Sequence, residues 1–426
     1  MRYLFILIAL FSLQTSHANN KINSLADNSN YLFIETKTLP IVDINFTIKN
    51  GSTVDGTYPG LTNLMLNTLM SSDVNSKKIV SYFEDVGAKL SYSVGKESLS
   101  ISIRSLSDIE QILKLVNIIN LAISSNEIDQ NIFSLEKDKI NRNISEVEKR
   151  PGSTLNADIS KHLFSGTGFE HQKIGTKRSI NKITSTQVIE HKNKIFNIKD
   201  IEINIVGNIS QSDSKSIIHT ITKNMSTESQ FNKSEYKLEQ SIHHTEFDST
   251  QSHLAVILPA VSRTSPNYHN ILVANYIFGG SGFGSWLMEE IREKRGLSYS
   301  VSSYLVSSKD GGYLKISLQT KNENIKLAKD IILNQIKRLQ LFDVTEDKIS
   351  SVKQSILRSF EMRTDTNKKL LNLLSAINSL ELDLDYFENY KNNLNQVSKT
   401  SIERSLKEAI DFNHISVFTV GKTIEE

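Results

Sequence analysis

Apolar residues along this chain follow first the period of a strand and then that of a helix. Ile44, Phe46 and Ile48 alternate with polar residues, which predicts a half-buried strand within 41–49. Across 107–124, large aliphatic residues recur at helical spacing, which predicts an amphipathic helix. The chain therefore mixes strands and helices instead of belonging to one class.

One order of predicted elements occurs twice. In the first half, strands are predicted at 31–35, 41–49, 90–94, 99–103 and 201–206, and helices at 61–70, 77–86, 107–124 and 126–149. In the second half, strands are predicted at 254–258, 299–305 and 415–420, and helices at 269–278, 286–295, 323–341 and 346–362. The polar stretch 223–240 separates the two sets as a linker. We predict an α+β fold of two tandem, similar α/β sandwich domains, 28–222 and 241–426. Each has a mostly antiparallel sheet with helices packed on one face.

The first eighteen residues have the form of a secretory signal peptide. Arg2 precedes an apolar core at 4–13, and Ser16-His17-Ala18 gives a small-x-small cleavage pattern. We predict cleavage after Ala18 and a periplasmic or secreted protein, with an uncleaved membrane anchor as the alternative. No later stretch is apolar enough for a membrane span.

Composition excludes several classes of function. Hydrophobic residues make up 38% and charged residues 23% of 426 residues, and the net charge is +2. This balance does not favour nucleic acid as a partner, because a nucleic-acid binder is expected to cluster basic residues on one face. The sequence has no cysteine, which excludes disulfides, thiolate zinc sites, cysteine nucleophiles and a lipoprotein anchor.

The segment 278–304 combines a glycine cluster with two polar side chains of chemical interest. Its four glycines, Gly279, Gly280, Gly282 and Gly284, precede Arg292 and, seven positions later, Tyr299. A glycine cluster by itself is a weak signal. The ordinary alternative is a loop, a helix and a strand, with Arg292 solvated and Tyr299 packed.

A second segment, 50–72, changes the interpretation of the glycine-rich segment 278–304. It reads NGSTVDGTYPGLTNLMLNTLMSS. Here the chain resembles the pitrilysin-like metallopeptidases (inverzincins), which include mitochondrial processing peptidase and the insulin-degrading enzyme. The resemblance covers about residues 30–424. Its further anchors are Leu39-Pro40, Asn50-Gly51-Ser52, Gly60-Leu61, Gly87-Ala88, Gly175-Thr176 and the segment from Arg292 to Tyr299.

The resemblance implies a zinc motif that this chain has lost. In the family, a helix carries His-x-x-Glu-His, whose histidines bind zinc together with a distant Glu while the first Glu acts as base. Asn63 and Asn67 fall at the histidine positions, Leu66 at the base and Asn143 near the distant ligand. Because asparagine is a poor zinc ligand and leucine cannot take a proton, we predict that this chain binds no zinc and that the zinc lies in a partner subunit.

No replacement metal site is predicted among the other histidines. The sequence contains no H-x-x-x-H pair, and His243-His244 with His253 is the nearest cluster. His162 and His171 are assigned to loop packing instead.

The second half keeps the arginine and the tyrosine that, in the family, lie across the cleft from the metal. The resemblance implies that Arg292 and Tyr299 bind the substrate carbonyl and the developing oxyanion. It also implies that the glycine loop lets a peptide or partner backbone approach closely. The leading hypothesis is an exported, zinc-less subunit of a heteromeric peptidase. Its partner would be a zinc-bearing homologous subunit, in a heterodimer or larger assembly, and its substrate a peptide or unfolded protein. The alternative is a catalytically inert binding scaffold; a one-chain peptidase conflicts with the lost motif.

Overall fold

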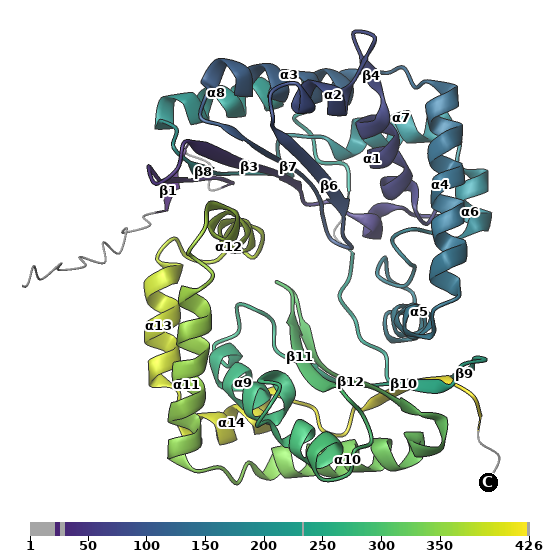
Figure 1. Ribbon diagram of the computed structural model, residues 1–426, viewed down its shortest axis with the longest axis vertical. Coiled ribbons are helices and arrows are strands. Elements are labelled where there is room, and N and C mark those ends of the chain that lie inside the picture. Colours follow the sequence, from purple (N-terminus) through teal and green to yellow (C-terminus); the bar gives the residue numbers. More distant parts are fainter. Residues whose placement is uncertain (1–21, 26–29, 232–233, 424–426) are drawn as a thin grey trace, which may run out of the picture.

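The computed structural model describes residues 22–25, 30–231 and 234–423, arranged as two α/β halves (Figure 1). The predicted signal peptide, residues 1–18, lies outside the described residues. Within the described ranges, no helix is long and apolar enough to cross a membrane.

The first half is built on a six-stranded sheet with β3 and β8 near its centre. The strand order is β1 (Asn23–Ser24), β2 (Tyr31–Glu35), β8 (Ile201–Gly207), β3 (Ile41–Ile48), β7 (Leu99–Leu106) and β6 (Lys89–Val94). Among these described strands, β2 and β8 pair in parallel and the other neighbours are antiparallel. The sheet is therefore mostly antiparallel, as predicted.

Seven helices of the first half share one apolar core with this sheet. They are α1 (Leu61–Ser71), α2 (Ile79–Glu84), α3 (Ile109–Ser124), α4 (Gln130–Glu148), α6 (Lys177–Lys182), α7 (Ser185–Ile195) and α8 (Gln211–Thr222). The long α3 begins at an aspartate cap, where the Asp108 side chain accepts a hydrogen bond from the Gln111 backbone N–H. Between α1 and α2 lies a short hairpin of β4 (Asp73–Val74) and β5 (Lys77–Lys78).

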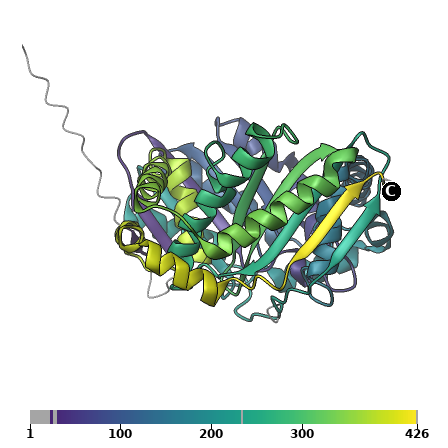
Figure 2. The ribbon, with the colours of Figure 1, turned by 90° about the horizontal axis from the view of Figure 1, so that it is seen from below.

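The second half repeats this plan around a five-stranded sheet. The strand order is β11 (Val301–Ser307), β12 (Gly312–Lys321), β10 (Gln251–Ala260), β13 (Ser416–Gly421) and β9 (Ile242–Glu246). The helices that share its apolar core are α9 (Tyr268–Asn275), α10 (Ile325–Leu341), α11 (Glu346–Glu361), α13 (Tyr386–Gln396) and α14 (Lys399–Ala409). Figure 2 shows β13 (yellow) beside the edge strand β9, which pairs with it in parallel. The two predicted domains thus have the same architecture.

Each half also contributes one helix that packs on the sheet of the other half, and we call this arrangement the helix exchange (Figure 1). From the first half, α5 (Pro151–Leu163) packs on the second sheet, where Leu155 and Ile159 meet Ala255 and Ile257 of β10. From the second half, α12 (Asn367–Ser379) packs on strands β3 and β8 of the first sheet. Both sheets are therefore covered on the face that their own helices leave open.

The prediction of a half-buried strand at 41–49 is wrong, because α12 of the second half covers the other face of β3. Along β3, the polar residues are buried as completely as the apolar ones; Asn45 is 7% exposed and Thr47 6%. The Asn45 amide oxygen accepts a hydrogen bond of 3.3 Å from the Ser375 hydroxyl of α12, 330 residues away. Local alternation could not reveal a cover that comes from the other end of the chain.

Candidate functional site

The three residues at the motif positions lie on α1, where the family carries its zinc ligands. Asn63 and Asn67 are one turn apart, and the Asn67 amide nitrogen donates to the Asn63 carbonyl oxygen (2.7 Å) and side-chain oxygen (3.2 Å). The Leu66 side chain is 0% exposed and belongs to the core of the first half. The two amides thus bond to each other, and the position of the base is filled by packing.

The fourth position, Asn143, lies exposed on α4, a helix that runs beside α1 in the opposite direction (Figure 1). Two turns earlier on α4, Glu136 is 4% exposed and its carboxylate accepts a 2.9 Å hydrogen bond from Ser71 at the end of α1. Lys139 also pairs with this carboxylate, at 2.6 Å. Glu136 was missed by sequence reasoning, because nothing local marks a buried glutamate in a charged helix. The equivalence of Asn143 to a ligand stays a prediction.

A buried polar chain holds the start of α1. Asp55 accepts hydrogen bonds from the backbone N–H groups of Gly60 (2.7 Å) and Thr62 (2.8 Å). The Thr62 hydroxyl donates to Asp55 at 2.6 Å and lies 2.8 Å from His191 Nε2. Since this hydroxyl has one proton to give, His191 must donate from Nε2.

Burial sets the charge states of Asp55 and His191 in this hydrogen-bonded network. Desolvation, followed by the nearby Lys194, lowers the pKa of His191 to about 4, so its ring is neutral at pH 7. Desolvation raises the pKa of Asp55 to about 6, although the hydrogen bonds from Thr62 and Gly60 act in the opposite direction. At pH 7 the aspartate is still mainly ionised and accepts all three bonds.

Replacing Thr62 with valine is expected to lower the free energy of unfolding by about 2–4 kcal/mol, because it strands the buried His191 N–H and takes a donor from Asp55. Thr62→Ser keeps the hydroxyl and is expected to cost only about 1 kcal/mol for the lost methyl group. Urea unfolding at pH 7.5 measures both variants. Equal losses for the two would show that the buried hydroxyl contributes no more to stability than the methyl group does.

The glycine loop divides into a packed part and an open part. A Cβ at Gly279 would lie 2.6 Å from side-chain atoms of Leu287 and Ser303, so this glycine serves internal packing. A Cβ at Gly280 would lie 2.8 Å from the Asn275 amide. Gly282 and Gly284 instead take positive φ angles of 70° and 81° with no neighbour within 4 Å. At Gly282 and Gly284 the space beside the backbone is therefore open to an approaching chain, and we call these two positions the open part of the loop.

Two π-helical turns flank this loop where ordinary helix was predicted. They are η2 (Tyr276–Gly280), which continues α9, and η3 (Met288–Glu293). Wide i+5 hydrogen bonds join Ser281 N–H to the Tyr276 carbonyl and Lys294 N–H to the Glu289 carbonyl. Such turns are rare and occur frequently at functional sites.

The two predicted site residues of this segment both reach the surface. The Arg292 guanidinium lies over the Phe283 ring, 4.7 Å from its centroid, and Phe283 itself is 71% exposed. Tyr299 is 88% exposed, which contradicts the ordinary alternative of a packed tyrosine. Within the described residues, no hydrogen bond or ion pair joins either side chain to α1. The motif positions on α1 and the segment from Arg292 to Tyr299 are therefore not linked by hydrogen bonds or ion pairs in the described part of the chain.

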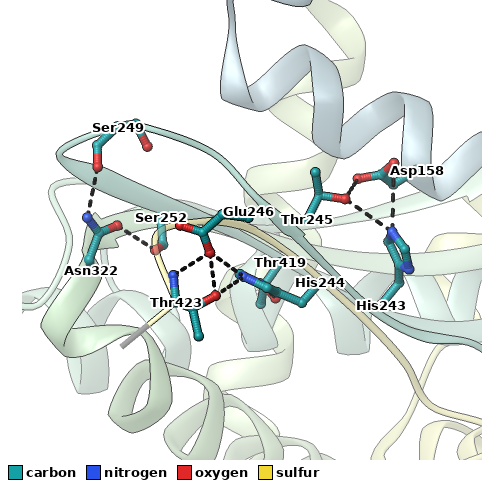
Figure 3. Close-up of polar contacts among 10 residues, drawn as sticks. All are labelled: Asp158, His243, His244, Thr245, Glu246, Ser249, Ser252, Asn322, Thr419 and Thr423. Carbon is teal, nitrogen blue, oxygen red and sulfur yellow. Dashed lines mark hydrogen bonds and ion pairs between the residues drawn. The ribbon is translucent and has the colours of Figure 1, made fainter. Parts of the chain in front are cut away.

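The structure regroups the histidines. His243 faces Asp158 of α5, whereas His244 approaches Thr419 and Thr423 on the other side of β9 (Figure 3). The ring of His162, also on α5, packs on that of His243. His253 lies beside Gly152 at the start of α5. The cluster predicted from sequence is therefore wrong in its membership, and His162 is not a loop residue.

A cavity of about 530 Å³ lies between α9, α13 and α14 in the second half. Arg263 and His269 line it together with the packed rings of Tyr386 and Tyr390. None of the residues predicted from the metallopeptidase motif borders it, so it is not part of the candidate site.

The fold and the degenerate motif define a non-catalytic, metallopeptidase-like protein. Two family models match adjoining parts of the chain: "Insulinase (Peptidase family M16)" over residues 31–177 and "Peptidase M16 inactive domain" over 182–356. The chain belongs to peptidase family M16. This confirms the resemblance to pitrilysin-like enzymes and the predicted fold class.

Relatives by sequence carry both peptidase and non-peptidase names. The "Non-peptidase homolog YmxG" of Helicobacter pylori is 22% identical over 92% of this chain and 91% of its own length. The "Uncharacterized zinc protease YmxG" of Bacillus subtilis is also 22% identical, over 78% of this chain and 80% of its own. The family name alone therefore does not indicate catalysis.

Solved structures share the fold at low identity. A peptidase M16 inactive domain from Pseudomonas fluorescens superposes with a TM-score of 0.88 at 24% identity, covering 95% of this chain and 98% of that one. The periplasmic protease PqqL of Escherichia coli gives 0.74 at 14% identity, covering 94% of this chain and 46% of its own. At these identities the match establishes the fold.

Proposed function

We propose that this protein is an exported, zinc-less subunit of a heteromeric M16 metallopeptidase. It would present Arg292, Tyr299 and the open part of the glycine loop to a peptide held in the cleft of a zinc-bearing partner. The observation that carries the proposal is that Tyr299 is 88% exposed while Arg292 is held over Phe283. Neither polar group is used up by hydrogen bonds inside the described part of the chain.

The chemistry of these groups suits the proposed role. A tyrosine hydroxyl and a guanidinium are both donors to the negative charge that develops on a carbonyl oxygen during hydrolysis. The partner would supply the zinc-bound water and the base, since α1 of this chain carries Asn63, Leu66 and Asn67 in their places. A divided site of this kind needs both subunits for catalysis.

Export is part of the proposal. It is supported by the sequence pattern of residues 1–18 and by the absence of cysteine. The E. coli structural neighbour is a periplasmic protease, which fits a periplasmic location for this chain. The partner would then be an M16 subunit exported to the same compartment.

The purified protein alone is expected to bind no zinc at α1 and to cleave no peptide, whereas mixing it with a zinc-bearing homologue should yield chelator-sensitive hydrolysis. A pull-down from the native periplasm, followed by metal analysis and identification of the co-purified chain, supplies the homologue. Activity is measured with unfolded-protein and peptide substrates at fixed concentration of the zinc-bearing subunit.

Two outcomes would decide against a divided peptidase. Chelator-sensitive cleavage by the isolated chain would overturn it, because α1 would then support catalysis. A stable complex without hydrolysis would instead establish the inert binding scaffold.

A further inference from the structure

Two histidines and one aspartate lie close together where α5, the helix of the first half that packs on the second sheet, crosses the edge strand β9. Asp158 and His162 are four residues apart on α5, so they share one face of the helix. His243 comes from β9 of the second half. One donor atom from each of the three residues lies within 4.8 Å of the other two.

The contacts bring the donors to a common point at the surface. The rings of His162 and His243 have centroids 4.1 Å apart and are tilted by 32°. His243 Nε2 lies 4.0 Å from Asp158 Oδ1, and Asp158 Oδ2 accepts a 2.8 Å hydrogen bond from the Thr245 hydroxyl (Figure 3). The Asp158 side chain is 16% exposed and that of His243 32%, so the group is sheltered but reachable from solvent.

The surroundings resemble a prepared ligand set more than a simple ion pair. One His–Asp pair would account for one histidine, whereas here a second imidazole packs on the first and has a nitrogen within 4.8 Å of the carboxylate. The Thr245 hydroxyl donates to Asp158 Oδ2 and accepts from His243 Nε2 over 3.1 Å, so this one side chain positions both the carboxylate and the imidazole, and a metal would take over the contact to His243. Orienting bonds of this kind to a ligating carboxylate are usual at metal sites.

The donor types select the class of ion. Two imidazoles with one carboxylate suit zinc and its neighbours cobalt, nickel and copper, whereas calcium and magnesium prefer all-oxygen sites. Three protein ligands would leave one tetrahedral position for water or an exogenous donor.

We propose that Asp158, His162 and His243 bind one divalent transition-metal ion of the zinc class. The site is separate from the lost motif on α1 and does not depend on the proposed peptidase partner. Because α5 belongs to the first half and β9 to the second, the ion would fasten the halves together.

The test uses the full chain without a polyhistidine tag, after treatment with chelator. Calorimetric titration with Zn²⁺ is expected to show one equivalent bound, and Co²⁺ should give visible d–d absorption. His162→Ala and His243→Ala are each expected to weaken Zn²⁺ binding by about tenfold or more, since even an outer-shell partner costs that much. Zn²⁺ should also raise the melting temperature of the wild type but of neither variant.

The chain offers a matched control next to the site. His244→Ala removes the neighbouring histidine of β9, which faces Thr419 and Thr423, and should leave binding unchanged. Circular dichroism checks the fold of each variant, and Asp158→Asn, which keeps an acceptor for Thr245, tests the carboxylate if a histidine variant misfolds. The proposal is overturned if the wild type binds no stoichiometric metal. Binding that survives the His162 and His243 substitutions, or that His244→Ala abolishes equally, also overturns it.

Discussion

Replacing Leu66 with glutamate is expected to lower the free energy of unfolding by about 3–5 kcal/mol, because the new carboxylate has no partner in the core. Leu66 is 0% exposed and packs in the apolar core of the first half. Restoring the family motif with Asn63→His, Leu66→Glu and Asn67→His should therefore damage the fold before it creates a base. Urea unfolding monitored by circular dichroism gives the loss.

A volume-conserving control separates charge from packing. Leu66→Met is expected to cost less than about 1.5 kcal/mol, because buried aliphatic exchanges of similar volume are tolerated. The paired substitution Asn63→His and Asn67→His, at half-buried positions, should leave most of the stability in place. If Leu66→Glu were as stable as Leu66→Met, the position would be a site for a polar group and not part of the core.

In the reconstituted complex, Arg292→Ala and Tyr299→Phe are each expected to lower kcat by about 10²-fold, the usual effect of removing one donor to an oxyanion. Loss of a contact made only in the transition state should lower kcat and kcat/KM together. Steady-state kinetics at a saturating concentration of this subunit measures both constants.

The controls lie in the same segment. Tyr304 is another exposed tyrosine, at 57%, and Tyr304→Phe should leave kcat unchanged. Arg295 pairs with Glu290, so Arg295→Ala should have little effect beyond that surface ion pair. A change in KM alone for Arg292→Ala and Tyr299→Phe would assign them to peptide binding. No change in either constant would remove both residues from the proposed site.

Local patterns predicted most of the elements. The helix at 61–70 is α1 (Leu61–Ser71) and the one at 346–362 is α11 (Glu346–Glu361), because periodicity and caps are encoded within a few turns. The exchange of α5 and α12 was not predictable, because neither helix differs in its own sequence from one that packs within its half. The buried polar face of β3 depends on the same exchange.

The candidate site was predictable only where it is local. Asn63, Leu66 and Asn67 were assigned through the family resemblance, whose motif lies within one helix, and the structure places them together on α1. The partner of His243 could not be found from its neighbours in sequence, since Asp158 and His162 lie some eighty residues earlier on a helix of the other half. The π-helical turns around the glycine loop were predicted as ordinary helix, because the hydrophobic pattern of a single wide turn does not differ from that of an α-helix.

The reciprocal helices have a consequence for biosynthesis. When the ribosome has completed β8, Glu202 and Asn204 have been made, but the groups that satisfy them from α12 have not. Ser379 donates to Glu202 at 2.5 Å and Asn378 to Asn204 at 3.0 Å, and both follow about 175 residues later. The nascent first half must therefore wait with hydrated polar groups on its sheet until the last quarter of the chain emerges. We therefore expect the first half to complete its folding only after α12 is available to it, and not as an independent domain.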